Sequence, residues 1–418
     1  MNRAFPPTRP GLSVVTAFLA SSMLATCLAA SPAAAVTITV HSTDGSGEGF
    51  NDTTPRSPVG GNPGKTLGAQ RFFLFQYAAN AWGLRLDGDL PVIVSASFSA
   101  LGGTANSATL GFAAPTTVHR DFKHAPASQT WYVAAVANQI SGTDWNDLAP
   151  GACPVPLANN KCPDLFAQFN SDVDNQTVLG SVDFYYGVDG NSGTDLDFLS
   201  VVLHEMGHGL GVLDLIDPST GRISPDPAND NCLTCSDAYT RRLENSRISP
   251  KQLSNMTNQQ RLMAIVDDGD LVWTGPAAKS VSDFQTAGVR NDGALQVYAP
   301  VVYEPGSSVA HLDTDLSPNE LMEPFLSNPP PRELALSKAV LEDVGWETFE
   351  VPRCGDPNHD NKITTTDALL MLHVAVGNVA CEEYACNVNF SGGNTTADAL
   401  IVLRRAVGQG LQLRCPLF

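Results

Sequence analysis

Two histidines and a glutamate stand together in residues 204 to 211, which read His-Glu-Met-Gly-His-Gly-Leu-Gly. Residues four apart lie about one turn from each other on one face of an α-helix, so His204 and His208 can reach a single ion. Imidazole binds Zn²⁺ at about 2.0–2.1 Å, and a catalytic site has a third protein ligand and an open position for water. Glu205 lies beside the pair, where its carboxylate can take a proton from a water that the metal activates. The pattern predicts a hydrolytic zinc site.

A glycine three residues after the second histidine allows a sharp turn out of the helix, because glycine tolerates left-handed geometry. The extended motif His-Glu-x-x-His-x-x-Gly, matched by His204, Glu205, His208 and Gly211, resembles that of the metzincin clan of zinc peptidases. The resemblance puts the next ligand at Asp214, where the clan usually has histidine. Aspartate at this place is known in one small group of secreted bacterial metzincins, so Asp214 is one candidate for the third ligand.

The other candidate is His311, which a Glu-Leu-Met turn at 320 to 322 follows closely. The segment 307 to 325 resembles the leishmanolysin-type pattern, in which an insertion separates the short motif from its third histidine. That resemblance implies that Met322 lies beneath the metal as a hydrophobic floor. Because imidazole is a softer ligand than a lone carboxylate, we take His311 as the third zinc ligand and keep Asp214 as the alternative.

The resemblance extends in outline from Val36 to about Trp346 and is closest to a loosely defined group of secreted bacterial metzincin-like proteins. It implies a zincin catalytic domain with an active-site helix, and a secreted endopeptidase that binds a protein or peptide substrate along an edge strand. The alternative is a non-catalytic binding or adaptor protein with an idle metal site. Glu205 favours the enzyme, because a structural zinc site needs no neighbouring base.

The elements around these residues predict one α+β domain from 36 to 350. A strand is predicted at 36 to 40, and another at 92 to 98 with one buried face, because apolar and polar residues alternate along it. Helices are predicted at 66 to 82 and within 331 to 346, where apolar residues recur at helical spacing.

The helix that carries the two histidines is expected to begin with Thr194 as its cap, answered by Asp197 in a capping box. Its end is expected at the glycines of 209 to 211. An edge strand beside the cleft is expected at 183 to 187, whereas the tract 102 to 163 is predicted to be rich in loops.

A second kind of site is predicted at 356 to 367, which read Asp-Pro-Asn-His-Asp-Asn-Lys-Ile-Thr-Thr-Thr-Asp. Calcium takes about six to eight oxygen ligands, and this spacing supplies oxygens at the first, third, fifth and twelfth positions. Asn361 stands where glycine is usual, and asparagine tolerates the left-handed turn. The predicted calcium ligands are Asp356, Asn358, Asp360, the carbonyl of Lys362, and Asp367, with Thr364 expected to hold a water.

A copy of this loop and of the helix after it follows 31 residues later. The duplication resembles a type I dockerin, which implies a small all-α calcium-binding domain at 351 to 418. The second loop lacks two carboxylates, so it is expected to bind calcium more weakly or only to keep its shape; its ligand places hold Asn387, Asn389, Ser391 and Asp398. Calcium then either folds a domain that binds nothing else or prepares it for a cohesin-type partner.

Composition limits the class of protein. The chain has 24 lysines and arginines against 43 aspartates and glutamates, a formal charge of −19, which argues against nucleic-acid binding. Residues 1 to 35 have Arg3 and Arg9, an apolar stretch and a small-residue end, the pattern of a secretory signal peptide. A lipoprotein signal would use Cys27, but Thr26 before it fits such a cleavage site poorly. No later stretch is apolar enough to span a membrane, so we expect a secreted, extracellular protein.

Eight of the nine cysteines follow the predicted signal peptide, and an even number in an exported chain favours disulfides. The pair at 232 and 235 can also be half a zinc site or a redox pair, but no second Cys-x-x-Cys accompanies it. Sequence proximity predicts the pairs Cys153 with Cys162, Cys232 with Cys235, Cys381 with Cys386, and Cys354 with Cys415.

Overall fold

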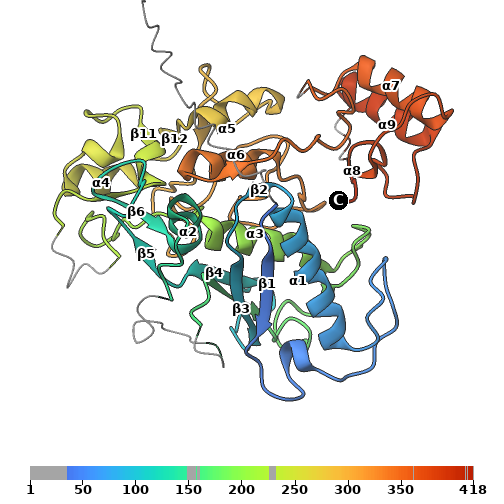
Figure 1. The fold of residues 1–418 in the computed structure, drawn as a ribbon, viewed down its shortest axis with the longest axis horizontal. Coiled ribbons are helices and arrows are strands. Elements are labelled where there is room, and N and C mark those ends of the chain that lie inside the picture. The colour runs from blue at the N-terminus through green and yellow to red at the C-terminus, as the bar shows by residue number, and fades with distance from the viewer. Residues whose placement is uncertain are drawn as a thin grey trace, which may run out of the picture. The chain divides into compact units, whose positions relative to one another are not determined.

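Four strands form the largest sheet, in the order β1-β3-β7-β4 (Figure 1). Strands β1 (Ile38–Ser42), β3 (Val92–Ser99) and β7 (Leu165–Asn170) are parallel, and β4 (Gly111–Pro115) pairs antiparallel with β7 at the edge. The computed structural model describes residues 35–147, 157, 161–225, 232–360, 362–409, 411 and 413–417. Residues 1 to 34 of the predicted signal peptide lie outside these residues, as do Cys153 and Asn361.

The strand prediction at 92 to 98 was right in position and wrong about its faces. Ile93 and Ser95 are buried, as is Val94 on the opposite face. Strand β3 lies between two parallel neighbours, β1 and β7, and burial of both faces is typical of a strand inside a parallel sheet whose two faces are covered.

Smaller sheets and short helices complete a mixed α+β structure in the described part of the chain. The remaining strands are β2 (Leu86–Asp87), β5 (Val118–His119), β6 (Thr130–Val133), β8 (Phe184–Tyr185), β9 (Leu196–Asp197), β10 (Ser236–Asp237), β11 (Leu243–Asn245), β12 (Leu271–Trp273), β13 (Leu295–Gln296) and β14 (Glu347–Thr348). The helices are α1 (Leu67–Gly83), α2 (Ala134–Ser141), α3 (Phe198–Leu210), α4 (Asn258–Ala264), α5 (Pro276–Ser280), α6 (Ala335–Val344), α7 (Thr365–Ala375), α8 (Glu383–Cys386) and α9 (Thr396–Ala406).

Helices α1 and α3 pack against each other and against the large sheet. Helix α1 begins after Thr66, whose hydroxyl accepts the Ala69 N–H at 3.1 Å, as a capping residue does. At its other end, the indole of Trp82 donates to the carbonyl of Leu203 on α3 at 3.1 Å. A buried tryptophan thus fixes α1 to the turn of α3 just before the first histidine.

Helix α3 begins later than predicted. Its cap is Asp197, whose Oδ1 accepts the Ser200 N–H at 3.0 Å, and Thr194 lies in the preceding turn. The other carboxylate oxygen of Asp197 pairs with Arg332, which explains why an aspartate serves here better than a threonine. The helix ends at Gly211 as predicted, with φ 138° at that glycine.

The expected edge strand at 183 to 187 is β8, which pairs with β9 in a separate two-stranded sheet. The strand that lies against α3 is β4 instead, from the tract that we predicted to be loop. Its sequence Gly-Phe-Ala-Ala-Pro has neither a β-branched residue nor a clear alternation, so its pairing with β7 is set by tertiary contacts rather than by local preference.

The described residues have two hydrophobic cores. The first, which we call the core of the main domain, draws on residues from Val36 to Trp346 and also on Leu417. The second belongs to the C-terminal module, which we define as residues 354 to 415, where α7 and α9 pack on each other. Both helices begin with a capping box, Thr364 with Asp367 and Thr395 with Asp398.

Three of the predicted disulfides are present: Cys232–Cys235, Cys354–Cys415 and Cys381–Cys386. Cross-links of this kind indicate an oxidising environment. Within the described ranges, none of the helices has the length and apolar character that a bilayer span requires.

Candidate metal centre

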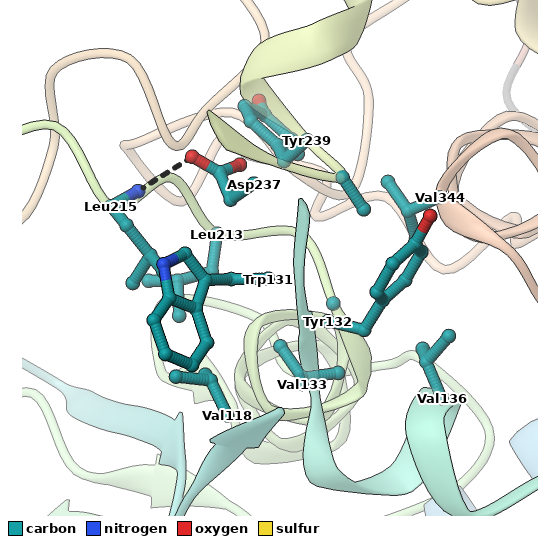
Figure 2. Close-up of a pocket in the computed structure, with 12 residues that line it drawn as sticks. Val118, Trp131, Tyr132, Val133, Val136, Leu213, Leu215, Asp237, Tyr239 and Val344 are labelled. Atoms are coloured by element: carbon teal, nitrogen blue, oxygen red, sulfur yellow. Dashed lines mark hydrogen bonds between the residues drawn. The ribbon is translucent and has the colours of Figure 1, made fainter. Parts of the chain in front are cut away.

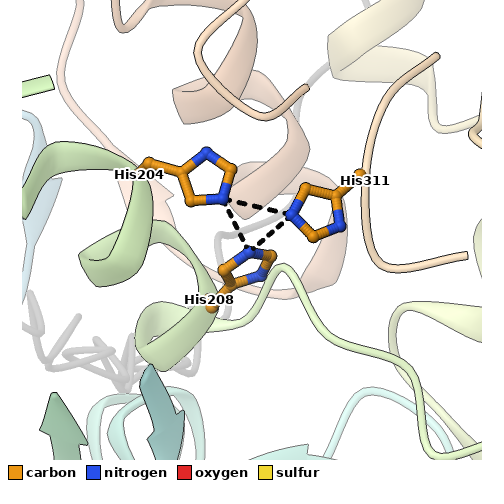
Figure 3. Close-up of side chains that lie close together, drawn as sticks. All are labelled: His204, His208 and His311. Carbon is orange, nitrogen blue, oxygen red and sulfur yellow. Dashed lines mark hydrogen bonds between the residues drawn. The ribbon is translucent and has the colours of Figure 1, made fainter. Parts of the chain in front are cut away.

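Three imidazoles from distant parts of the chain converge on one point (Figure 3). His204 and His208 come from one face of α3, and His311 comes from the segment after β13. The Nε2 atoms of His204 and His208 are 3.0 Å apart, and each lies 3.1 Å from Nε2 of His311. A triangle of this size lets a single ion lie about 2.0–2.1 Å from all three nitrogens.

Each ring is oriented through its other nitrogen. Nδ1 lies 2.7 Å from the Leu321 carbonyl in His204, 2.7 Å from the Val212 carbonyl in His208, and 2.8 Å from the Ser307 carbonyl in His311. A carbonyl only accepts, so Nδ1 must carry the proton and Nε2 the lone pair. Three lone pairs that face one another at about 3 Å repel unless a cation lies between them, so this donor set fits a metal ion.

Burial keeps these imidazoles neutral. It lowers the pKa of His204, lowers that of His208 to about 3 with a smaller contribution from His204, and holds the pKa of His311 well below its usual range. A neutral imidazole is the form that binds a metal. The site is therefore ready to take an ion near neutral pH without first losing protons.

Glu205 lies beside the triad and is 7% exposed. It faces β4: a Cβ on Gly111 would lie 3.2 Å from its Cγ, and the Ala113 N–H donates to its carboxylate. Burial raises the pKa of Glu205 to about 8, and the hydrogen bond from Ala113 opposes that rise. A carboxyl group that can exchange a proton therefore lies between the triad and an edge strand.

Met322 lies under the helix between the two histidines. It is fully buried, and a Cβ on Gly207 would lie only 2.7 Å from its Sδ. Its carbonyl accepts the Leu312 N–H at 2.8 Å, next to His311. Glycine at 207 is thus required for the close approach of this methionine, and the Glu-Leu-Met turn contacts both segments that supply histidines.

The chain was compared with known protein families and with curated proteins. No protein-family model matches the chain, and no curated protein matches it either.

Asp214, the alternative third ligand, is not part of the triad in the described structure. Its Oδ1 accepts the Ile216 N–H at 2.9 Å. Burial first, and then the neighbouring Asp237, raise the pKa of Asp214 to about 7. The half-buried Asp214 thus lies near the buried Asp237 rather than at the triad.

A pocket that is partly open to solvent follows the end of α3 (Figure 2). Its walls are mostly apolar, and the Leu215 N–H donates to Asp237 at 3.2 Å on one side of it. Residues from α2, β6, the turn after α3 and α6 line it, among them Trp131, Val133, Val136, Gly211, Leu213 and Val344.

The first predicted calcium loop brings Asp356, Asp360 and Asp367 together, with one carboxylate oxygen of each within 4.8 Å of the others. Asp356 and Asp367 are fully buried, and Oδ1 of Asp367 has no hydrogen-bond partner. A buried carboxylate oxygen without a donor is costly, so this loop fits a hard cation.

The side chains at the other predicted positions make hydrogen bonds within the loop. Oδ1 of Asn358 accepts the Asp360 N–H at 2.9 Å, and Oδ1 of Asp360 accepts the Lys362 N–H at 2.9 Å. The hydroxyl of Thr364, expected to hold a water, donates to Oδ2 of Asp367 at 2.8 Å. These bonds prearrange the loop around the acidic cluster.

In the second loop the corresponding aspartate is satisfied by the chain itself. Oδ1 of Asp398 accepts the Asn389 N–H at 3.2 Å, and Oδ1 of Asn387 accepts the Ser391 N–H at 2.9 Å. The described residues of this loop form no acidic cluster. It therefore keeps its shape with amides and backbone hydrogen bonds in place of charge.

Proposed function

We propose that the chain is a secreted zinc endopeptidase of the metzincin type, which hydrolyses internal peptide bonds of protein or peptide substrates with Glu205 as general base. The observation that carries the proposal is the convergence of three Nε2 lone pairs beside a buried carboxylate. A purely structural zinc site has four protein ligands and no use for Glu205. Here three imidazoles leave a position open.

His204, His208 and His311 would hold the ion, and the proposal leaves Asp214 out of the ligand set because its carboxylate is used elsewhere. A zinc ion at this place would polarise the scissile carbonyl and lower the pKa of a water. The three hydrogen bonds that the Nδ1–H groups donate to backbone carbonyls keep the rings oriented while the substrate enters and leaves.

Strand β4 supports binding of an extended substrate. It is one of the two edge strands of the large sheet, and it lies against α3. An extended peptide can add to such an edge through main-chain hydrogen bonds, which suits an enzyme that cleaves many sequences. Gly111 on this strand lies next to Glu205, so the scissile bond would come close to the general base.

Glu205 then moves two protons. Its carboxylate takes one from the attacking water and later returns one to the leaving amine nitrogen. Burial raises the pKa of Glu205, which favours return of the proton to the leaving amine, whereas a cation beside the carboxylate would lower that pKa and keep the group available as a base. Removal of this group stops the chemistry and leaves the ligands in place.

The test compares the wild type with Glu205→Gln, which has nearly the same volume. The variant should cleave casein at least about 1000-fold more slowly, within the range of a lost acid-base group, and keep one zinc per chain by elemental analysis. Unchanged turnover in the metal-loaded variant would refute the role of Glu205.

A second proposal concerns the C-terminal module: a calcium-dependent, dockerin-like module that attaches the protein to a cohesin-type partner. It is supported by exposed apolar side chains that repeat 31 residues apart on α7 and α9. They are Leu369 and Leu372 on α7 with Val376 just after it, and Leu400 and Leu403 on α9 with Val407 just after it. Apolar residues that repeat this way on a surface mark an interaction site more often than a solvated one.

Calorimetric titration with a type I cohesin domain, with and without calcium, tests this module directly. Binding that requires calcium, and that is weakened by Leu372→Asp together with Leu403→Asp, supports the adaptor function. Absence of binding in calcium would reject that partner. An adaptor without enzymatic activity is the function that remains if cohesin binds and casein is not cleaved.

A further inference from the structure

Residues 413 to 417 run from the C-terminal module back to the main domain. Cys415 forms a disulfide with Cys354, two residues before the first residue of the acidic loop, Asp356. Leu413 packs on Gly355, where a Cβ would lie 2.5 Å from its Cδ1 and where φ is +87°. The segment is therefore fixed to the start of the first calcium loop.

The far end of the same segment belongs to the core of the main domain. Leu417 is 7% exposed and is part of that core. Its carbonyl accepts from Nη1 of the buried Arg85 at 3.1 Å, and its N–H donates to the Tyr77 hydroxyl at 3.4 Å. Both partners belong to α1 or to the residues that follow it, so the segment is anchored on the helix that carries Trp82.

Between these two ends, Arg414 contacts the turn that leads to α3. Its Nη1 donates to the Gly190 carbonyl at 3.0 Å and to Oδ1 of Asn191 at 3.2 Å. Arg332 lies on the same glycine, because a Cβ on Gly190 would be 3.5 Å from an atom of either arginine.

Arg332 connects this turn to the start of the helix. It donates to the Val188 carbonyl at 2.6 Å and pairs with Asp197, the cap of α3. The C-terminal segment thus reaches, through one further side chain, the first turn of the helix that carries His204 and His208.

A second attachment to the main domain is made by residues 353 and 354. The N–H of Cys354 donates to Oε2 of Glu333 at 3.4 Å, and the guanidinium of Arg353 lies 3.9 Å over the Phe284 ring. Both sides of the disulfide are therefore attached to the main domain, one through 353 and 354 and the other through 414 and 417.

We propose that the segment 413 to 417 is a clamp through which calcium binding at the loop 356 to 367 stabilises the main domain. The proposal rests on the calcium site proposed above. Without a cation the clustered carboxylates of Asp356, Asp360 and Asp367 repel one another, and the loop that positions Cys354 loosens. An ion that binds only the ordered loop stabilises that loop and, with it, the contacts of the segment 413 to 417 with Arg85 and Gly190.

The distribution of tryptophan gives this coupling a specific readout. All five tryptophans of the chain lie between 82 and 346, and the C-terminal module has none. The thermal transition followed by tryptophan fluorescence therefore reports the main domain, while calorimetry reports calcium binding at the module. Full-length, zinc-loaded protein is compared after dialysis into zinc-containing buffer with and without calcium.

Calcium should raise the tryptophan-detected Tm of the wild type by about 5 °C. The variant Arg414→Ala/Leu417→Ala should still bind calcium by calorimetry and lose most of that shift. The matched control is Arg404→Ala/Val407→Ala, which removes an exposed arginine of α9 and the exposed valine that follows the helix, and it should keep the full shift.

The outcomes distinguish failure of the proposed clamp from failure of the proposed calcium site. A wild type that binds calcium without any shift of the tryptophan transition, or a clamp variant that keeps the shift, overturns the clamp and leaves the calcium site standing. A wild type that binds no calcium overturns both. Neither result bears on the zinc site, which the casein assay tests separately.

Discussion

His204 and Leu321 are joined by a hydrogen bond of 2.7 Å between the imidazole Nδ1 and the backbone carbonyl, across 117 residues of chain. The bond ties the first histidine of α3 to the Glu-Leu-Met turn. The same turn holds the backbone next to His311, because the Leu312 N–H donates to the Met322 carbonyl. One backbone turn therefore helps to position two of the three imidazoles. The geometry of the centre thus depends on a segment that supplies no ligand.

Substitution of Gly207 by alanine should disturb this arrangement. The added Cβ would lie 2.7 Å from Sδ of Met322 in a packed core, so we expect a loss of about 1–3 kcal/mol in unfolding free energy and weaker zinc binding. Urea unfolding and a zinc titration measure the two effects. The double variant Gly207→Ala/Met322→Ala provides the control, because it removes the clash: it should be more stable than the sum of the single changes predicts. Strict additivity would contradict the contact.

Loss of His311 and loss of Asp214 should have different effects on metal binding. His311→Ala removes one of the three converging nitrogens and should weaken zinc affinity by more than about 100-fold, the upper range for a residue that only supports a ligand. Asp214→Asn should keep zinc, because the carboxylate is hydrogen-bonded to Ile216 outside the triad. Competition with a fluorescent chelator measures both affinities, and the reverse order would make Asp214 the ligand.

The helix and the histidine pair could be predicted from sequence because both depend on local spacing. His204 and His208 share a face by the geometry of any α-helix, and the stop at Gly211 follows from its tolerance of positive φ. The choice of cap could not be predicted in the same way. Asp197 is favoured over Thr194 by its pairing with Arg332, 135 residues away, which no local pattern contains.

The strand against α3 escaped prediction for a similar reason. The residues 111 to 115 lack strand propensity, and they form β4 because β7 offers a free edge there. A signal was present in Gly111, since a glycine in a strand often marks a close approach, here that of Glu205. Two tryptophans brace α3 by donating to the carbonyls of Leu203 and Leu210, and these long-range contacts have no local sequence pattern.

Asp164 should make the main domain less stable as the pH rises. Burial raises its pKa from 3.8 to about 7, although Ile93 N–H and Asn138 donate to it. The folded state therefore holds a proton that the unfolded state has lost between about pH 4 and pH 7, and the stabilisation present below pH 4 disappears over that window. The slope should be about 1 kcal/mol per pH unit.

The measurement is urea unfolding of wild type and Asp164→Asn at intervals from pH 5 to pH 8. The amide does not titrate, so the difference in unfolding free energy between the two proteins should change across the window in the direction given. Parallel curves for the two proteins would show that Asp164 is not the group responsible.

Calcium binding should have a stoichiometry of about one. The first loop has three clustered aspartates, whereas the second satisfies Asp398 through the Asn389 N–H. Asp367→Asn should abolish the calorimetric signal, because it removes a buried carboxylate whose Oδ1 has no other partner. Asp398→Asn is the matched control and should leave one ion bound. Two ions per chain in the wild type would show that the amide-lined loop also binds.

X-ray absorption at the zinc edge of the purified protein tests the central claim most directly. The account predicts one zinc per chain with three imidazole nitrogens at about 2.0–2.1 Å, and with one of these lost in His311→Ala. A protein that binds no zinc, or a shell in which fewer than three imidazoles appear in the wild type, would contradict it.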